Sequence, residues 1–282
     1  MISIITATWN AAATLPDNLA CIAGQTTPVE HLLIDGASTD GTLEMIKEYC
    51  SAPLTPDPSR LTASDPSRLT RFISEPDQGI YDAMNKGIAL ATGEIIGILN
   101  ADDFYADNNV LAKVARVFED PAIEACYGDL LYVSEIPDAS PLTPDASRPL
   151  PPDASGFTVK RYWKSGEFAP RKFYWGWMPP HPTFFVRRSV YERFGTFNLA
   201  LGTAADYEIM LRFLLKHRIK LAYIPEILVK MRVGGASNAS VNNRLKANRN
   251  DRKAWEVNGL TPAPWTLAMK PLRKLPQWWL RP

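Results

Sequence analysis

The stretch Glu94–Asp103 reads EIIGILNADD and joins an apolar run to two adjacent carboxylates. Its first six residues are rich in β-branched side chains, which is typical of a buried strand. In an open α/β sheet, ligands lie in the crevice beyond the carboxyl ends of the strands, where Asp102 and Asp103 are expected. Carboxylates there suit a hard divalent cation that substrate phosphates also hold. The stretch therefore predicts an α/β fold that handles a metal-bound diphosphate.

Apolar runs alternate with helical patterns on both sides of this stretch, which predicts a parallel sheet with helical crossovers. The predicted strands of the first half are Ile2–Thr6, His31–Ile34, Arg71–Ser74 and Glu94–Leu99, and the predicted helices are Leu15–Ala23, Thr42–Tyr49 and Ile80–Ala91. Further on we expect strands at His181–Val186 and Lys220–Ile224, the second ending at Pro225, and helices at Ser189–Phe194, Asp206–His217 and Lys246–Val257.

Two segments rich in Pro, Ser and Asp interrupt this alternation, at about 51–70 and 137–155. PLTPDPSR at 53–60 recurs as PLTPDASR at 141–148. Such segments cannot bury enough apolar surface to form a core, so we expect exposed loop insertions; the alternative is a pair of docking segments. The expected organisation is a catalytic domain over residues 1–240 and a basic, Trp- and Pro-rich extension over 241–282.

Composition and charge exclude several classes of protein. The net charge is +1, which gives no support to a nucleic-acid partner. The three cysteines are widely spaced and follow no metal-ligand pattern, which argues against a disulfide framework or zinc site and fits a reducing cytoplasm. Neither a leader-like amino terminus nor an apolar run of about 20 residues is present, so we expect a protein that is neither secreted nor transmembrane.

Two further polar segments lie where strands end and helices begin. Residues 35–42 (DGASTDGT) can reach a ligand or form a plain turn and N-cap. Residues 75–87 open a helix on which Tyr81 and Asn85 share a face; the alternative is a capped helix with a solvated surface. Neither a dinucleotide fingerprint nor a Walker motif is present.

Four single residues are candidates for a site. Asp206 opens a helical pattern and serves either as a helix cap or as a general base, whereas Glu208 lies further into the helix and is the weaker candidate. His181 either contacts substrate or packs among aromatic side chains. Arg232 begins the segment 232–237 (RVGGAS), which forms either a basic loop that closes over a diphosphate or an ordinary turn.

Five motifs occur in a fixed order along the chain: SIITATWN at 3–10, DGASTDGT at 35–42, SEPDQGIYDAMNKG at 74–87, NADD at 100–103 and ADYE at 205–208. Together they resemble the family 2 glycosyltransferases, specifically the bacterial members that build exopolysaccharide and lipopolysaccharide. The resemblance covers roughly residues 1–240 apart from the two insertions.

The resemblance implies an A-type glycosyltransferase fold, with a mostly parallel central sheet flanked by helices, a Rossmann-like nucleotide-sugar-binding half and an acceptor half. It also implies a nucleotide-diphospho-sugar donor, Mn²⁺ or Mg²⁺ as cofactor, and inversion at the anomeric carbon. The donor contacts expected from the motifs and from the basic loop are Thr8, Asn10, Asp35, Tyr81, Asn85, Lys86, Asp102 and Arg232.

Two positions depart from the family pattern. Asn100 stands where the Asp-x-Asp motif has its first Asp, which leaves Asp102 and Asp103 as the expected metal contacts. Asp206 matches the catalytic base, but Ala205 stands where many members have Glu. His181 and Glu208 are the expected acceptor-side residues.

The last residues suggest where the reaction takes place. Trp265, Trp278 and Trp279 lie among basic residues, which suits either peripheral contact with the inner face of a membrane or packing on the catalytic domain. The expected acceptor is a glycan or a lipid-linked molecule. The alternatives are a sugar-nucleotide pyrophosphorylase, disfavoured by the missing Gly-rich basic amino-terminal loop, and a non-catalytic sugar-nucleotide-binding protein, which Asn100 and Ala205 would allow.

Overall fold

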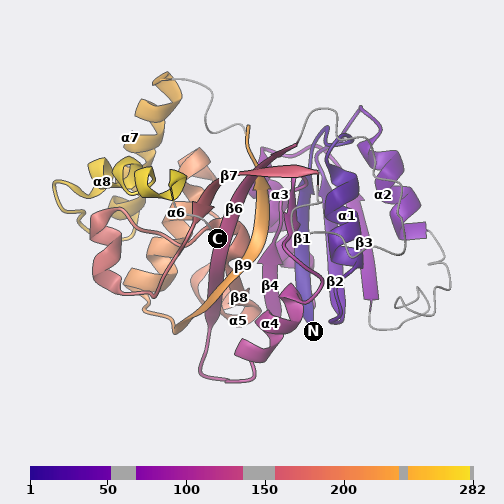
Figure 1. Ribbon diagram of the computed structural model, residues 1–282, viewed down its shortest axis with the longest axis horizontal. Coiled ribbons are helices and arrows are strands. Elements are labelled where there is room, and N and C mark those ends of the chain that lie inside the picture. The colour runs from indigo at the N-terminus through magenta and orange to yellow at the C-terminus, as the bar shows by residue number, and fades with distance from the viewer. Residues whose placement is uncertain (52–67, 136–155, 235–240, 280–282) are drawn as a thin grey trace.

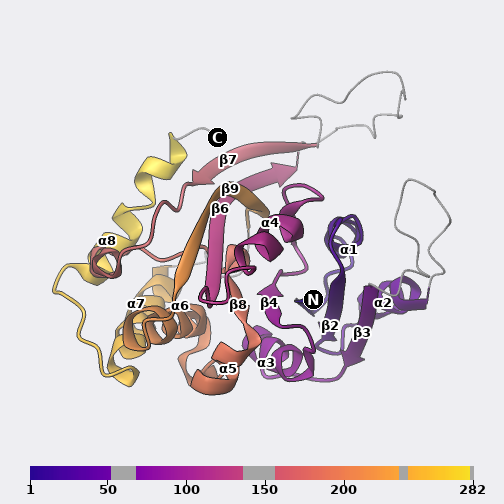
Figure 2. The same ribbon diagram turned by 90° about the horizontal axis from the view of Figure 1, so that it is seen from below.

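One nine-stranded sheet runs through the computed structural model, which describes residues 1–51, 68–135, 156–234 and 241–279 (Figure 1). The strand order is β3-β2-β1-β4-β8-β6-β9-β5, and β7 pairs with β6. Helices lie on both faces of this sheet, as the second view shows (Figure 2). The predicted α/β class is therefore confirmed.

The first half of the sheet is parallel, as predicted. Its strands are β1 (Ile2–Thr8), β2 (Val29–Asp35), β3 (Arg68–Ser74) and β4 (Ile95–Ile98), and its helices are α1 (Leu15–Ala23), α2 (Thr42–Ser51) and α3 (Ile80–Leu90). Because side chains alternate across a strand, Ile4 packs in a cluster with Ile22 of α1, whereas Ile5 packs with Met84 of α3. Helices α1 and α3 therefore cover opposite faces.

Gly87 brings α3 close to the sheet. A Cβ atom at this position would lie 2.4 Å from Cγ2 of Ile5 on β1, so any side chain would push the helix away. The glycine in this otherwise regular helix marks a close-packed side.

The second half of the sheet is mixed. Its strands are β5 (Asp103–Tyr105), β6 (Ala125–Glu135), β7 (Phe157–Trp163), β8 (Phe185–Arg187) and β9 (Leu221–Arg232). Strand β8 is antiparallel to both β4 and β6, whereas β6 is parallel to β9. Around these strands lie α4 (Val110–Val117), α5 (Arg188–Phe194), α6 (Ala205–Met210) and short turns of 3-10 helix at η1 (Pro170–Trp175), η2 (His181–Thr183) and η3 (Leu199–Ala204).

Three sequence predictions in this half need correction. Strand β9 continues through Pro225 instead of ending there, because its register against β6 shifts between Tyr127 and Asp129, and a proline is tolerated where the ladder is interrupted. The segment predicted as one strand from His181 is the 3-10 turn η2 followed by β8. The predicted helix from Asp206 is α6 followed by the π-helical turn η4 (Leu211–Lys216).

The chain beyond residue 240 packs against this second half. It forms α7 (Val241–Val257), α8 (Thr266–Leu272) and η6 (Leu275–Trp278), with α7 and α8 beside α6 and η1 (Figure 1). Trp255 is fully buried in the largest hydrophobic cluster, and Oγ1 of Thr266 donates to the main-chain oxygen of Tyr174 at 2.8 Å. Within the described ranges, no helix has both the length and the hydrophobicity to cross a bilayer.

The two predicted insertions fall mostly outside the described residues. Ser51 still belongs to α2 and residues 68–70 already belong to β3. The remainder of 51–70 and the whole of 137–155 lie outside the described ranges.

Candidate active site

Three polar side chains stand in register at the carboxyl ends of β1, β2 and β3. Thr8 pairs with Asp35, and Asp35 pairs with Ser74. The buried carboxylate of Asp35 accepts hydrogen bonds from Thr8 Oγ1 (3.0 Å), Ser74 Oγ (2.7 Å), Ser38 Oγ (2.5 Å) and Ser38 N–H (3.1 Å). Asp35 therefore fixes the loops after three parallel strands, and Thr8 and Asp35 lie at the predicted edge of the sheet.

Asn10 joins the first two of these loops. Its main-chain N–H donates to Ser38 Oγ at 2.8 Å, and its side-chain oxygen accepts from the N–H of Thr39 at 2.9 Å. Its φ of 47° lies in the left-handed region, which asparagine tolerates better than most residues. Next to it, Trp9 is 70% exposed.

The predicted metal contacts lie in the turn between β4 and β5, and they differ in access. Asp102 is half-buried, whereas Asp103 is fully buried at the start of β5. From α1, Nδ2 of Asn18 donates to the main-chain oxygens of Asn100 (2.9 Å) and Asp103 (3.0 Å) and so holds the turn. Burial, together with the charge of Asp102, raises the pKa of Asp103 well above its usual range.

Two buried oxygens in this turn lack a hydrogen-bond donor. Nδ2 of Asn100 donates to Oδ2 of Asp103 at 3.3 Å, but Oδ1 of each residue has no partner among the described residues. Undonated carboxylate and amide oxygens beside the carboxylate of Asp102 are the ligand type that Mg²⁺ and Mn²⁺ prefer. Because the described ranges contain no group of three or more His, Cys, Asp and Glu arranged to hold a metal, phosphate oxygens would have to complete the coordination.

Arg232 is hydrogen-bonded to the main chain of the acidic turn. It is the last residue of β9, so the prediction that it lies on a flexible loop is wrong; residues 235–237 of that loop lie outside the described ranges. Its guanidinium forms ion pairs with Asp17 and with Glu135 (3.1 Å) and donates to the main-chain oxygen of Asp102 at 2.9 Å. Its charge is thus already paired.

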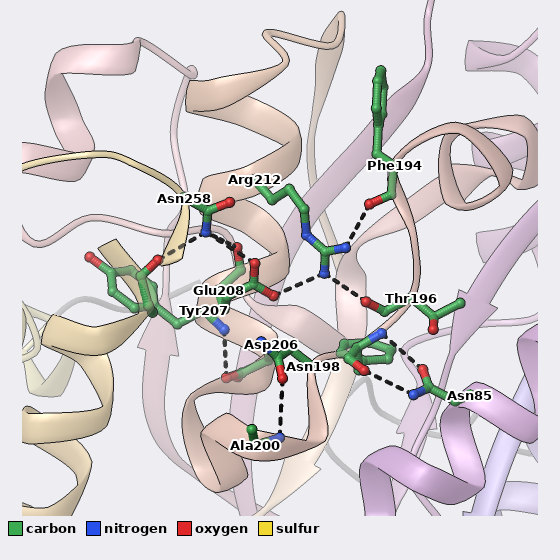
Figure 3. A network of polar contacts seen from close by, with 12 residues as sticks. Asn85, Phe194, Thr196, Asn198, Ala200, Asp206, Tyr207, Glu208, Arg212 and Asn258 are labelled. Atoms are coloured by element: carbon green, nitrogen blue, oxygen red, sulfur yellow. Dashed lines mark hydrogen bonds and ion pairs between the residues drawn. The ribbon is translucent and has the colours of Figure 1, made fainter. Parts of the chain in front are cut away.

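Asp206 lies in the first turn of α6, where its Oδ1 accepts from the N–H of Tyr207 at 2.7 Å (Figure 3). Tyr81 approaches it from α3: burial and the nearby charge of Asp206 raise the pKa of Tyr81. The ring of Phe197 lies 5.3 Å from Tyr81 and 5.6 Å from His181. Burial lowers the pKa of His181, and the charge of Asp206 opposes that shift. The structure therefore brings Tyr81, His181 and Asp206 together.

Asn85 and Lys86 hold loops next to this cluster. Both ends of the Asn85 amide are bonded to the main chain of Phe197, each at 2.9 Å (Figure 3). Lys86 pairs with Glu75 at 2.8 Å and donates to the main-chain oxygen of Pro76 at 3.1 Å. Both residues are predicted to contact the nucleotide-sugar donor. In the structure their side chains instead form hydrogen bonds and an ion pair with other residues of the protein.

Glu208 does not face the predicted acceptor side. It is buried, with Oε2 2.9 Å from Nη2 of Arg212 and Oε1 accepting from Nδ2 of Asn258 at 3.0 Å (Figure 3). Arg212 also donates to the main-chain oxygens of Phe194 and Thr196, each at 2.6 Å. These contacts connect α6 to Asn258, which directly follows α7, and to the loop after α5, so both carboxylate oxygens of Glu208 are used in packing.

Sequence reasoning missed Tyr132 on β6 and Arg161 on β7, which pack against each other. The guanidinium carbon of Arg161 lies 3.6 Å from the ring centroid of Tyr132 and 5.9 Å from that of Trp278 in η6. Burial raises the pKa of Tyr132; Arg161 opposes this shift, and the charges of Asp103 and Asp206 both add to it. No local pattern marks this contact, because the pairing of β7 with β6 and the docking of η6 on β7 create it.

The chain is similar in sequence to known glycosyltransferases. The model of the family "Glycosyl transferase family 2" matches residues 3–195. A PGL/p-HBAD biosynthesis glycosyltransferase of Mycobacterium bovis is 29% identical over 246 residues, covering 86% of this chain and 80% of the relative. An uncharacterized glycosyltransferase of Mycobacterium tuberculosis is 28% identical over 218 residues, covering 75% of this chain and 68% of that protein.

Solved structures show the same fold. Staphylococcus aureus TarS, residues 1–349, in complex with UDP-GlcNAc superposes with a TM-score of 0.64 at 15% identity, covering 95% of this chain and 69% of that one. The mannosyltransferase PcManGT of Pyrobaculum calidifontis, in complex with GDP-Man and Mn²⁺, gives 0.59 at 17% identity, covering 95% and 68%. The chain thus has the A-type glycosyltransferase fold, and it belongs to glycosyl transferase family 2.

Proposed function

We propose that this glycosyltransferase moves a sugar from a nucleotide-diphospho-sugar to a hydroxyl group of a glycan or lipid-linked acceptor, with inversion at the anomeric carbon. The process it serves is the synthesis of a cell-surface polysaccharide or glycolipid. The observation that carries the proposal is the acidic turn at the end of β4, where Oδ1 of Asn100 and Oδ1 of Asp103 are buried without a donor among the described residues. A diphosphate held at this turn would have its sugar attacked by an acceptor that Asp206 activates.

The chain's own residues supply most of the reaction. Asp206 accepts the proton of the acceptor hydroxyl, and the acceptor oxygen forms a bond to the anomeric carbon from the face opposite the diphosphate. The bond between that carbon and the diphosphate oxygen breaks, and the diphosphate leaves with the electron pair. Tyr81 orients Asp206, and the loops fixed by Asp35 hold the nucleoside.

The acidic turn fits a divalent cation. Asp102, Asp103 and the side-chain oxygen of Asn100 would hold Mn²⁺ or Mg²⁺, because two of their oxygens are buried without a donor. When bound, the ion would supply positive charge that offsets the charge growing on the diphosphate. Of the two carboxylates, the half-buried Asp102 is the one open to phosphate, and Asp103 lies behind it.

Contact with an anionic bilayer through the C-terminal arm, residues 265–279, completes the proposed function. Trp265, Leu272 and Trp279 are spaced seven apart and are 45%, 49% and 75% exposed. Lys270 instead points inward to Asp251, at 2.6 Å. These apolar side chains of the arm therefore face solvent.

The charge of this region matches an anionic surface. From Arg244 to the end of the chain there are nine Lys and Arg against two Asp and Glu. Of these, Arg249, Arg252, Lys253, Arg273 and Lys274 are exposed. Exposed tryptophans flanked by basic residues suit a lipid headgroup interface. We expect the reaction to take place at the cytoplasmic face of a membrane, where a lipid-linked acceptor would be available.

A panel of nucleotide sugars tests the reaction. The purified protein is incubated with UDP-, GDP-, dTDP- and ADP-sugars, and the release of nucleoside diphosphate is measured with Mn²⁺ and with EDTA. The proposal predicts metal-dependent release from one class of donor. Conversion of a nucleotide sugar and added pyrophosphate into a nucleoside triphosphate and a sugar 1-phosphate would instead favour a pyrophosphorylase.

A further inference from the structure

The acidic turn, residues 100–103, is held at both ends by one buried side chain. Asn18 of α1 is fully buried, and its Nδ2 donates one hydrogen to the main-chain oxygen of Asn100 at 2.9 Å and the other to that of Asp103 at 3.0 Å. The N–H of Asp103 donates to the same Asn100 oxygen at 3.0 Å. The orientation of the Asn18 amide therefore decides whether the turn keeps these bonds.

Buried polar side chains continue from Asn18 through the parallel half of the sheet. Oγ1 of Thr6 on β1 lies 3.4 Å from Oδ1 of Asn18 and 3.1 Å from Nε2 of His31 on β2. The other ring nitrogen of His31, Nδ1, lies 3.3 Å from the hydroxyl of Tyr49 on α2. Thr6, Asn18 and His31 are each at most 1% exposed, so they depend on one another for hydrogen bonds.

One direction of donation satisfies all of these groups. Because main-chain oxygens carry no proton, Nδ2 of Asn18 faces the turn and its Oδ1 accepts from the hydroxyl of Thr6. The Thr6 oxygen then accepts from His31, so Nε2 carries the ring proton. Nδ1 is left with a lone pair and accepts from the hydroxyl of Tyr49. Burial lowers the pKa of His31 to about 3, which agrees with a neutral ring.

We propose that Thr6, His31 and Tyr49 are positioning residues that set the orientation of Asn18 and, through it, the shape of the acidic turn. With Nδ2 of Asn18 on the main-chain oxygens, the two buried side-chain oxygens of the turn that lack a donor stay available to a cation. With the amide flipped, Oδ1 of Asn18 would face two carbonyl oxygens and both bonds to the turn would be lost. The inference rests on the proposed function, in which the turn holds Mn²⁺ or Mg²⁺.

Two substitutions of Thr6 separate this role from packing. Thr6→Val keeps the shape of the side chain and removes the hydroxyl, whereas Thr6→Ser keeps the hydroxyl and removes a methyl group. The dissociation constant of Mn²⁺ alone is measured on the full chain from the electron paramagnetic resonance signal of the free ion. We expect Thr6→Val to weaken binding about three- to tenfold, the range for loss of one neutral hydrogen bond, and Thr6→Ser to bind like wild type.

Hydrogen exchange tests the positioning without a metal. The N–H of Asp103 is bonded to the main-chain oxygen of Asn100, so its exchange in D₂O reports opening of the turn. Relative to the core amides of β2 in the same protein, this exchange should be about three- to tenfold faster in Thr6→Val. Thr266→Val is the matched control, because it removes another fully buried threonine hydroxyl, which donates to the main-chain oxygen of Tyr174. It should leave the Mn²⁺ affinity and the relative exchange at wild-type values.

The tautomer of His31 provides a test on the wild-type protein. A long-range ¹H–¹⁵N spectrum distinguishes the ring nitrogen that carries the proton from the one with the lone pair. We expect a neutral ring with its proton on Nε2. A proton on Nδ1 would overturn the inference, because the hydroxyl of Thr6 would then donate to His31 and leave Asn18 without its donor.

The outcomes for Thr6 have different meanings. Equal Mn²⁺ affinity and equal relative exchange in wild type and Thr6→Val overturn the inference and leave the proposed function standing. Equal losses in Thr6→Val and Thr6→Ser also overturn it, because packing and not the hydroxyl then supports the turn. A wild-type protein that does not bind Mn²⁺ overturns the proposed metal site and this inference with it.

Discussion

Tyr81 on α3 lies close enough to Asp206 on α6 for the charge of that carboxylate to add to burial in raising the pKa of Tyr81. Helix α3 covers the parallel half of the sheet, and α6 belongs to the mixed half. The contact therefore connects the half that carries the predicted donor loops to the half that carries the proposed base. The two bonds between Asn85 and Phe197 join the same two halves one helical turn further along α3.

Tyr81→Phe should lower kcat by roughly tenfold and leave nucleoside diphosphate binding unchanged, because it removes the hydroxyl that we expect to orient the base. Initial-rate kinetics and calorimetry measure the two effects. Should the variant instead bind the diphosphate more weakly at unchanged kcat, Tyr81 would be a donor contact, as the motif comparison first predicted.

Asp102→Asn should abolish the rise in thermal midpoint that Mn²⁺ causes in the wild type. A ligand at 100 times its Kd stabilises the folded state by about 2.7 kcal/mol, so the wild-type shift is measurable. Scanning fluorimetry with MnCl₂, with and without UDP or GDP, gives the comparison. Asp107→Asn, an exposed carboxylate paired with Lys113, is the control and should keep the shift. A full shift in Asp102→Asn would exclude Asp102 as a metal contact.

Glu208→Gln should lower the free energy of unfolding by about 3 kcal/mol or more, because it leaves Arg212 buried without its carboxylate. Urea unfolding measures the change. The exposed pair of Glu192 with Arg188 provides the control, and Glu192→Gln should change stability by less than about 1 kcal/mol. If the unfolding curve of Glu208→Gln is unaltered and its KM for the acceptor is higher, Glu208 contacts the acceptor, as the sequence predicts.

Trp278→Ala/Trp279→Ala should weaken binding to vesicles that contain phosphatidylglycerol by about tenfold or more, since both rings are exposed on the arm. Co-sedimentation measures bound protein, and added salt should weaken the wild-type interaction. Trp9→Ala removes an equally exposed ring outside the arm and should bind as wild type does. Wild-type protein that stays in the supernatant at low salt would contradict the membrane contact.

The parallel half of the fold could be predicted because its signals are local. Each strand is an apolar run followed by a turn motif, and the predicted bounds of α1 match those observed. The mixed half could not, because its order depends on pairings between distant segments: β8 lies between β4 and β6, and β9 passes Pro225 at a register shift.

The candidate site divides in the same way. Motifs located Thr8, Asp35, Asp102 and Asp206, which lie at strand ends or at the start of a helix. One of the two carboxylates paired with Arg232 is that of Asp17, 215 residues away, and no local pattern reveals such an ion pair. Arg161 and Trp278 likewise meet only because η6 docks on β7.

The most direct measurement of the central claim is the turnover of Asp206→Asn. The variant keeps the size of the side chain and removes its capacity to accept a proton, so kcat for transfer should fall by at least 100-fold while the Kd of the nucleoside diphosphate stays within about twofold of wild type. Glu192→Gln, on the exposed surface of α5, should retain wild-type kcat. Turnover of Asp206→Asn at the wild-type rate would contradict the assignment of Asp206 as the base.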